Sequence, residues 1–134
     1  MIVLDASAAV ELLLALPASH AVEEQLRRHL HEGIHAPHLI DAEVGQVLRR
    51  EVLRGDLSRR RAELALRHLG ELPLRRHPHL PLAGLAFGVA ANLTFYDALY
   101  VALARALGAE LLTTDRRLAR AAARYVRSVV VEAG

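Results

Sequence analysis

The sequence predicts an α/β protein built on a parallel β-sheet. Short apolar runs alternate with segments of helical periodicity from one end of the 134-residue chain to the other, and this alternation is typical of strands joined by helical crossovers. Apolar residues make up 53% of the sequence, which is enough for a buried core in a chain of this length. No repeat, linker or low-complexity block interrupts the pattern, so we expect residues 1–134 to form a single domain.

Two strands and four helices are predicted in the first half of the chain. Ile2–Leu4 fits a strand covered on both faces, because its side chains are aliphatic or β-branched throughout. A second strand is expected at Ile34–Ala36, and proline, serine or glycine residues mark the ends of the helices around it. The four helices are expected from Ala6 to Leu16, where Pro17 follows, from Ser19 to Gly33, from Pro37 to about Gly55, and from Ser58 to about Leu72.

The second half of the chain adds three strands and three helices. A weak strand at Leu74–His77 is followed by an alanine- and glycine-rich helix at Pro81–Ala91. Thr94 is suited to cap the next helix, which carries an apolar stripe, and Gly108 is the residue at which it would end. The last three elements are a strand at Glu110–Thr113, a helix at Arg116–Tyr125 and a strand at Ser128–Val131.

The composition excludes several classes of protein. The chain has no cysteine, which excludes a disulfide framework, a thiolate metal site and a cysteine nucleophile. All 17 basic residues are arginine, so no mechanism that needs lysine is available, whereas arginine suits bidentate recognition of phosphate. The longest apolar stretch, Leu80–Ala91, is too short for a bilayer span of about 20 residues, and Asp5 interrupts the apolar start where a signal segment would continue. We expect a soluble, cytoplasmic protein without a membrane partner.

Four acidic residues from distant parts of the chain are predicted to meet at one edge of the sheet. Asp5 and Asp115 each follow a predicted strand, and the carboxyl ends of parallel strands lie at the same edge. Asp97 falls in the first turn of the helix after Thr94, and Glu43 falls early in the helix after the second strand. Helices that follow strands start at this same edge, so the sequence predicts a cluster of carboxylates there.

Helix capping is the competing explanation for three of these acids. Asp5 and Asp115 are both favoured N-cap residues for the helices that follow them. Thr94 and Asp97 fit a variant of the capping box, with a carboxylate three residues after the cap. Glu43 is the acid that helix capping explains least, since it is neither a cap by type nor in the first turn.

A cluster of this kind is suited to bind a hard metal ion. Carboxylates held together repel one another, which raises the pKa of at least one of them unless a cation intervenes. Ligation by oxygen alone, without histidine or cysteine, favours Mg²⁺ or Mn²⁺. Such an ion lowers the pKa of a bound water and contacts a phosphate oxygen, so the predicted chemistry is hydrolysis of a phosphodiester.

In four segments the sequence resembles the PIN-domain family, and more narrowly the VapC toxins of toxin–antitoxin pairs. These segments are the strand-Asp5-Ala-Ser7 opening, Pro37-x5-Glu43, the run Tyr96–Ala104, and Leu112-Thr-Thr-Asp115-x2-Leu118. The resemblance covers essentially the whole chain in length, element order and motif order. The run Tyr96–Ala104 together with Thr114-Asp115 is its most specific part.

The resemblance implies a fold, an activity and partners. It implies a three-layer fold with a parallel five-stranded sheet in the order 3-2-1-4-5, and an endoribonuclease that depends on Mg²⁺ or Mn²⁺. It also implies a homodimer, and a VapB-like antitoxin that blocks the site. The family's acidic positions correspond to Asp5, Glu43, Asp97 and Asp115, with Asp5 and Asp97 as the primary metal ligands, and its small hydroxyl positions correspond to Ser7 and Thr114.

Other residue types offer weaker signals. The eight histidines lack the helical spacing of a zinc site, and we expect them at the surface. Arg116 and Arg117 adjoin Asp115, so they are the arginines we expect to contact RNA. Tyr96 and Tyr100 lie on a helical stripe, and we expect them in the core or in a dimer interface rather than stacked on a base.

Several other functions compete with a ribonuclease toxin. A phosphoacceptor receiver needs a lysine that the chain lacks, and a haloacid-dehalogenase-type phosphatase needs a second aspartate where the chain has Ser7. An RNA-processing PIN nuclease, a DNA-directed one and a non-enzymatic α/β interaction module remain open.

Overall fold

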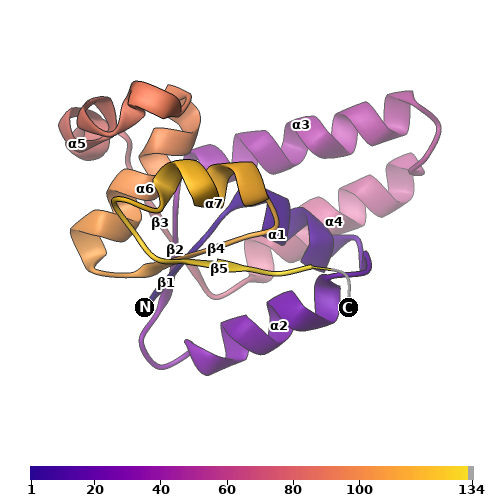
Figure 1. The fold of residues 1–134 in the computed structure, drawn as a ribbon. Coiled ribbons are helices and arrows are strands. Elements are labelled where there is room, and N and C mark those ends of the chain that lie inside the picture. The colour runs from indigo at the N-terminus through magenta and orange to yellow at the C-terminus, as the bar shows by residue number, and fades with distance from the viewer. Residues whose placement is uncertain (133–134) are drawn as a thin grey trace.

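A parallel five-stranded β-sheet with the strand order β3-β2-β1-β4-β5 forms the centre of the molecule. The computed structural model describes residues 1–132 of the chain. Helices cover the sheet on both faces (Figure 1), so the predicted α/β class and the implied strand order are confirmed. The strands are β1 (Ile2–Leu4), β2 (Ile34–Pro37), β3 (Leu74–His77), β4 (Glu110–Thr113) and β5 (Ser128–Val130).

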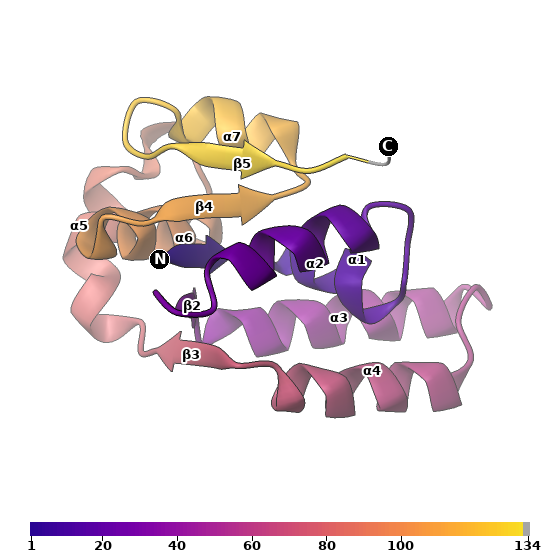
Figure 2. The same ribbon diagram turned by 90° about the horizontal axis from the view of Figure 1, so that it is seen from below.

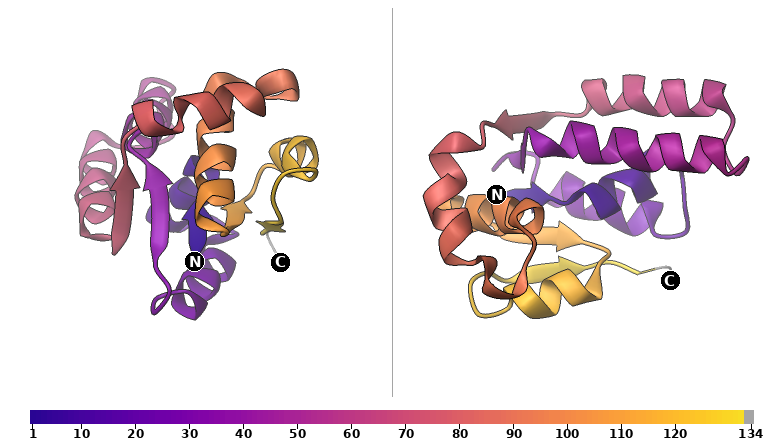
Figure 3. Two further views of the ribbon diagram at one scale, coloured as in Figure 1. Left: turned by 90° about the vertical axis from the view of Figure 1, so that its left-hand side faces the viewer. Right: turned by 90° about the horizontal axis from the view of Figure 1, so that it is seen from above.

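The helices form three groups around this sheet, with α5 packed against α6. α6 and α7 lie on one face, while α1 and α2 pack against each other on the opposite side (Figures 1 and 2). α3 and α4 pack side by side and extend beyond the sheet as a helical hairpin (Figure 3). The helices are α1 (Ala6–Leu13), α2 (Ser19–Arg28), α3 (Leu39–Leu53), α4 (Arg59–Glu71), α5 (Ala83–Gly88), α6 (Phe95–Leu107) and α7 (Arg116–Ala122), with 3₁₀-helices η1 (Leu80–Leu82) and η2 (Ala90–Asn92) flanking α5.

The strand β1 occupies the central position, which explains why its residues are all apolar. It pairs with β2 on one side and β4 on the other, with Ile2 opposite both Ile34 and Glu110. All three of its side chains are fully buried. Strand β3 at one edge is less buried, with Arg75 exposed and its other residues half-buried, as expected for a sheet edge.

Several predicted boundaries were wrong, each for a local reason. The first helix stops at Leu13 rather than Leu16, because Ala15 adopts a positive φ of 51° and turns the chain before Pro17. Pro37 is the last residue of β2 rather than the opening of the next helix. The predicted helix Pro81–Ala91 is broken into η1, α5 and η2, and its longest unbroken segment ends at Gly88.

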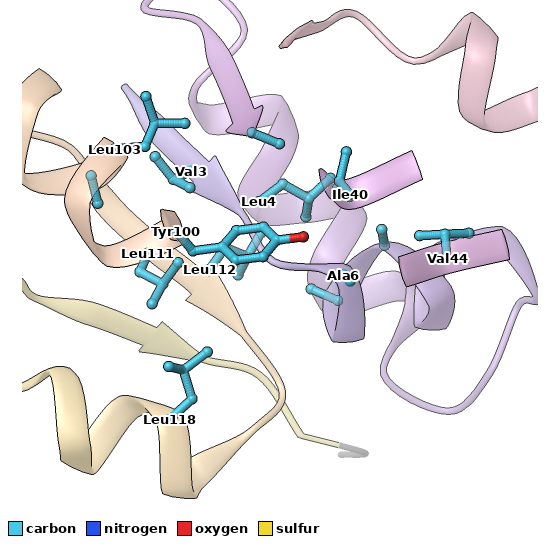
Figure 4. Packing of buried hydrophobic residues seen from close by; sticks show 14 of the residues in the cluster. Val3, Leu4, Ala6, Ile40, Val44, Tyr100, Leu103, Leu111, Leu112 and Leu118 are labelled. Atoms are coloured by element: carbon cyan, nitrogen blue, oxygen red, sulfur yellow. The ribbon is translucent and has the colours of Figure 1, made fainter. Parts of the chain in front are cut away.

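The core brings together β1, β4, α3 and α6. Figure 4 shows the ring of Tyr100 on α6 among Leu4, Leu111 and Leu112 of the strands, with its hydroxyl oxygen directed toward the side of Ile40 on α3. Tyr100 is fully buried, so its hydroxyl group must find a partner inside the protein. Every helix within residues 1–132 is too short or too polar to cross a lipid bilayer.

Candidate active site

Four carboxylates lie where strands end and helices begin, and we call Asp5, Glu43, Asp97 and Asp115 the acidic site. Asp5 directly follows β1, and Asp115 follows β4. Glu43 lies early in α3, while Asp97 lies in the first turn of α6. Because α6 ends just before β4 begins, its first turn is at the edge where the strands end. Repulsion from Asp5 contributes to the raised pKa of both Glu43 and Asp97, so the acids are close enough to interact.

Asp5 is buried and held by two hydroxyl groups. Its Oδ2 accepts hydrogen bonds from Ser7 Oγ at 2.6 Å and from Thr113 Oγ1 at 2.7 Å. It occupies the N-cap position of α1, yet its side chain makes no capping hydrogen bond. Burial raises the pKa of Asp5, and hydrogen bonds from the hydroxyl groups of Ser7 and Thr113 and from the main chain of Ala6 and Ser7 oppose this effect only in part. Its carboxylate is therefore buried and held in a fixed orientation.

Glu43 receives a hydrogen bond from the core tyrosine. Tyr100 donates its hydroxyl proton to Glu43 Oε1 at 2.6 Å, a short distance typical of a bond to an ionised carboxylate. Burial is the largest cause that raises the pKa of Glu43, and repulsion from Asp5 and Asp97 adds to it. The Tyr100 bond acts in the opposite direction and favours the ionised form. Glu43 thus has a raised pKa and a fixed orientation, as a proton acceptor requires.

Asp97 lies beside a small cleft and an arginine. Its main-chain N–H donates to Thr94 Oγ1 at 3.1 Å, so Thr94 caps α6 as predicted. Burial raises the pKa of Asp97, and so does repulsion from Asp5 and Asp115, while the charge of Arg117 acts against them. A cleft of 150 Å³ is lined by Thr94, Asp97, Arg117 and neighbouring residues of η2 and α7. The Asp97 carboxylate and the Arg117 guanidinium group of this cleft are therefore accessible to solvent.

Asp115 acts as a helix cap, as capping propensity predicts. Its Oδ1 accepts hydrogen bonds from the N–H groups of Arg117 at 2.9 Å and Leu118 at 3.1 Å. Its charge still acts on Asp97, so it belongs electrostatically to the acidic site.

The hydroxyl contacts of Asp5 include a residue that the sequence did not indicate. Besides Ser7, the hydroxyl group of Thr113 donates to Asp5. Thr114 contributes its main-chain N–H, which donates to Ser7 Oγ at 3.1 Å. Ser7 takes the expected place beside Asp5. Successive side chains of a strand point to opposite faces of the sheet, and the Thr113 side chain is the fully buried one.

The two arginines beside Asp115 differ in their surroundings. Arg116 forms an ion pair with Glu132, whereas the charge of Arg117 acts on Asp97. The histidines are not all at the surface, because His35 is buried and its Nδ1 lies 2.9 Å from His77 Nε2. Tyr100 is the residue whose role the helical stripe could not reveal, since the stripe predicts burial but not a bond to Glu43.

The donor set suits a hard cation bound partly through water. None of the ion pairs formed within residues 1–132 involves a member of the acidic site, so these charges lack a fixed cationic partner there. In the same part of the chain, no three histidine or acidic side chains are close enough to ligate one ion together. Mg²⁺ commonly binds one or two carboxylates and keeps several waters, which is compatible with this spacing.

Known proteins share both the sequence and the fold of this chain. The family model for the PIN domain matches residues 2–124. Ribonuclease VapC1 of Mycobacterium tuberculosis is 50% identical over 121 residues, which are 89% of each chain. Ribonuclease VapC12 of the same organism is 43% identical over 120 residues, 90% of this chain and 91% of that one.

Two solved structures share this fold. PAE2754 from Pyrobaculum aerophilum superposes with a TM-score of 0.72 at 28% identity, covering 96% of this chain and 83% of that one. VapBC2 from Rickettsia felis, bound to a DNA fragment from their promoter, gives a TM-score of 0.70 at 13% identity, covering 98% of this chain and all of the matched one. This second match concerns the fold alone. The chain belongs to the PIN-domain family and, within it, to the VapC ribonucleases.

Proposed function

We propose that this chain is the toxin of a toxin–antitoxin pair, and that it hydrolyses phosphodiester bonds in cellular RNA with the help of Mg²⁺ or Mn²⁺. The observation that supports this most strongly is the acidic site. It combines four carboxylates from separate elements, and the pKa values of Asp5, Glu43 and Asp97 are raised. Perturbed acids that gather at the carboxyl edge of a parallel sheet are typical of a functional site.

Asp5 and Asp97 are the residues we assign as primary metal ligands, with Glu43 and Asp115 completing the negative surroundings. A bound divalent ion would stabilise negative charge on the phosphate and lower the pKa of a water molecule. Ser7 and Thr113 fix the orientation of the Asp5 carboxylate, which lowers the reorganisation needed when a cation binds.

The other polar groups of the site act on substrate and water. Glu43, held by Tyr100, is placed to accept a proton from the attacking water. Arg117 adjoins Asp97 in the open cleft, where its guanidinium group can contact a phosphate of the RNA. Asp115 holds the start of α7, and therefore Arg117, in place through its capping bonds.

An antitoxin and a second copy of the chain are the partners we propose. The antitoxin is supported by the identity to the VapC ribonucleases and by the fold shared with VapBC2. The homodimer is supported by a group of large apolar side chains that are exposed between η1 and the start of α6. These side chains are Leu80, Leu85, Phe87, Phe95 and Tyr96.

Metal dependence of RNA cleavage tests the proposal. The purified chain should cleave a structured RNA with Mg²⁺ or Mn²⁺, lose this activity in EDTA and regain it when the metal is restored. Asp97→Asn should reduce cleavage strongly, whereas Asp56→Asn, at an exposed position on the α3–α4 turn, should not. Cleavage that persists in EDTA would contradict the metal mechanism. Absence of cleavage with either metal would favour a non-enzymatic module, and equal cleavage of single-stranded DNA would favour a nuclease outside a toxin–antitoxin pair.

A further inference from the structure

We propose that the surface formed by α7 and the turn before β5 binds the phosphate backbone of single-stranded RNA outside the acidic site. The inference rests on the proposed ribonuclease function and extends it to a second binding surface. We call Arg105, Arg120, Arg124 and Arg127 the arginine patch. All four side chains are exposed.

Two adjoining grooves bring these arginines together. The larger groove, of 580 Å³, lies between α7 and β5 and contains Arg120, Arg124 and Arg127 in its lining. The second groove, of 350 Å³, joins the end of α6 to the same turn and includes Arg105 and Arg127. Among residues 1–132, Glu110 is the one acidic residue that lines either groove. The surface therefore has a strong excess of positive charge.

Several other arginines of this chain are paired with nearby glutamates. Arg27, Arg28 and Arg59 form ion pairs with glutamates one helical turn away. Within residues 1–132, no member of the arginine patch takes part in an ion pair. Its guanidinium groups are therefore available to an external anion, and arginine matches phosphate with two parallel hydrogen bonds.

A tyrosine lies at the centre of the patch. The ring centroid of Tyr125 is 5.8 Å from the guanidinium carbon of Arg105 and 5.6 Å from that of Arg124. Tyr125 lines both grooves and is half-buried. An aromatic ring among unpaired arginines is typical of surfaces that bind single-stranded nucleic acid, where bases stack on rings and on guanidinium planes.

The position of the patch favours RNA over an acidic protein segment. Helix α7 starts directly after Asp115, and Arg117 in its first turn acts on Asp97. Arg120 lies one turn further along the helix, and the turn after α7 reaches the edge where the strands begin (Figure 2). Seven residues of helix span about 10 Å, so a strand of RNA that crosses the acidic site can continue along α7 into the grooves.

The test measures RNA binding without cleavage. In the Asp5→Asn background and in EDTA, binding of a fluorescein-labelled single-stranded RNA is followed by anisotropy at several salt concentrations. The combined substitutions Arg120→Ala, Arg124→Ala and Arg127→Ala should weaken binding about a hundredfold at about 0.1 M salt. The slope of log K against log[salt] should become smaller by about 2, because each phosphate contact on a single strand contributes about 0.7.

Two control proteins isolate the role of the patch. Arg49→Ala, Arg50→Ala and Arg60→Ala together remove the same charge from exposed positions on α3 and α4, and should leave the affinity and the salt slope nearly unchanged. Replacing the three patch arginines by lysine keeps the charge and should restore much of the binding. Thermal unfolding of each protein shows whether it is folded.

The outcomes separate the arginine patch from the proposed function. Equal loss of binding in the patch and control proteins, or no loss in either, would overturn the proposal. If the patch substitutions weaken binding of polyglutamate by the same factor as binding of RNA, the patch is a general anion-binding surface. This result would also overturn the proposal. Cleavage by the unsubstituted chain is measured separately, so RNA that binds the patch but is never cut would contradict the ribonuclease function alone.

Discussion

Replacing Tyr100 by phenylalanine tests how the acidic site is tuned. The substitution removes one hydroxyl oxygen from a fully buried ring and leaves the apolar packing in place. The lost interaction is the 2.6 Å hydrogen bond to Glu43 Oε1, which favours the ionised carboxylate. In the variant, the remaining influences on Glu43 are burial and its acidic neighbours, and both raise its pKa. We expect Glu43 to bind its proton more tightly.

The expected magnitude follows from the nature of this bond. A hydrogen bond to a charged group contributes about 1.5–3 kcal/mol, against about 1 kcal/mol for one between neutral groups. The acid limb of the pH–rate profile should move toward higher pH by about one pH unit for each 1.4 kcal/mol of lost interaction. The loss of folding stability should likewise grow from about 1 kcal/mol, where Glu43 is protonated, to about 1.5–3 kcal/mol at higher pH where it is ionised.

The assay combines kcat/KM for RNA cleavage as a function of pH with urea unfolding at low and high pH. Ser58→Ala is the matched control, because it removes the N-cap bond of α4 at 3.1 Å and should lose about 1 kcal/mol without moving the acid limb. An acid limb that is the same for Tyr100→Phe and the unsubstituted chain would refute the role assigned to the Tyr100–Glu43 bond.

Three further predictions concern Asp5 and the sheet. Thr113→Val removes a hydroxyl group 2.7 Å from Asp5 Oδ2 with little change in side-chain shape. It should lower the free energy of unfolding in urea by about 1.5–3 kcal/mol and raise the Mg²⁺ concentration needed for half-maximal activity. An unchanged free energy of unfolding and an unchanged Mg²⁺ requirement would contradict the role of this hydroxyl group. The pKa of Asp5 is raised above its ordinary value of 3.8, so its contribution to stability is complete below that pH and is lost as the pH rises through the raised pKa. Without metal, the thermal stability of Asp5→Asn relative to the unsubstituted chain should therefore increase with pH, and a constant difference would be inconsistent with a buried ionised Asp5. Gly33→Ala should lower stability by about 1–3 kcal/mol, because Gly33 has a φ of 108° and a Cβ there would lie 2.7 Å from His35 Nε2; Gly55→Ala, at a φ of 83° with open space around it, should lose less.

The fold was predictable from the sequence because its signals are local. The run Ile2–Leu4 is apolar throughout, since both faces of the central strand are covered. Gly108 takes a positive φ of 64° at the end of α6, as a C-terminal glycine is expected to do. The prediction of one continuous helix at Pro81–Ala91 was wrong, because an apolar composition does not show where a helix is interrupted. Its flanks wind as 3₁₀-helices instead.

The places of the four acids in the fold were predictable from the sequence, but their supporting contacts were not. Strand ends and helix starts point to the carboxyl edge of the sheet, which is where Asp5 and Asp97 lie. The partners of these acids come from far along the chain, since Thr113 is 108 residues from Asp5 and Tyr100 is 57 residues from Glu43. No short-range pattern encodes such contacts. Which of the neighbours Thr113 and Thr114 directs its hydroxyl group at Asp5 depends on the face of the sheet that each side chain occupies, and the composition of the run does not show this.

The most direct test of the account is the cleavage activity of Asp5→Asn at neutral pH with Mg²⁺. Asparagine keeps the size of the side chain and removes only the buried charge that Ser7 and Thr113 orient. We predict that RNA cleavage is abolished while thermal stability without metal is at least as high as that of the unsubstituted chain, with Asp56→Asn retaining full activity. Unchanged cleavage by Asp5→Asn would contradict the central role of this carboxylate, and a loss of stability with cleavage preserved would show that Asp5 is a structural residue.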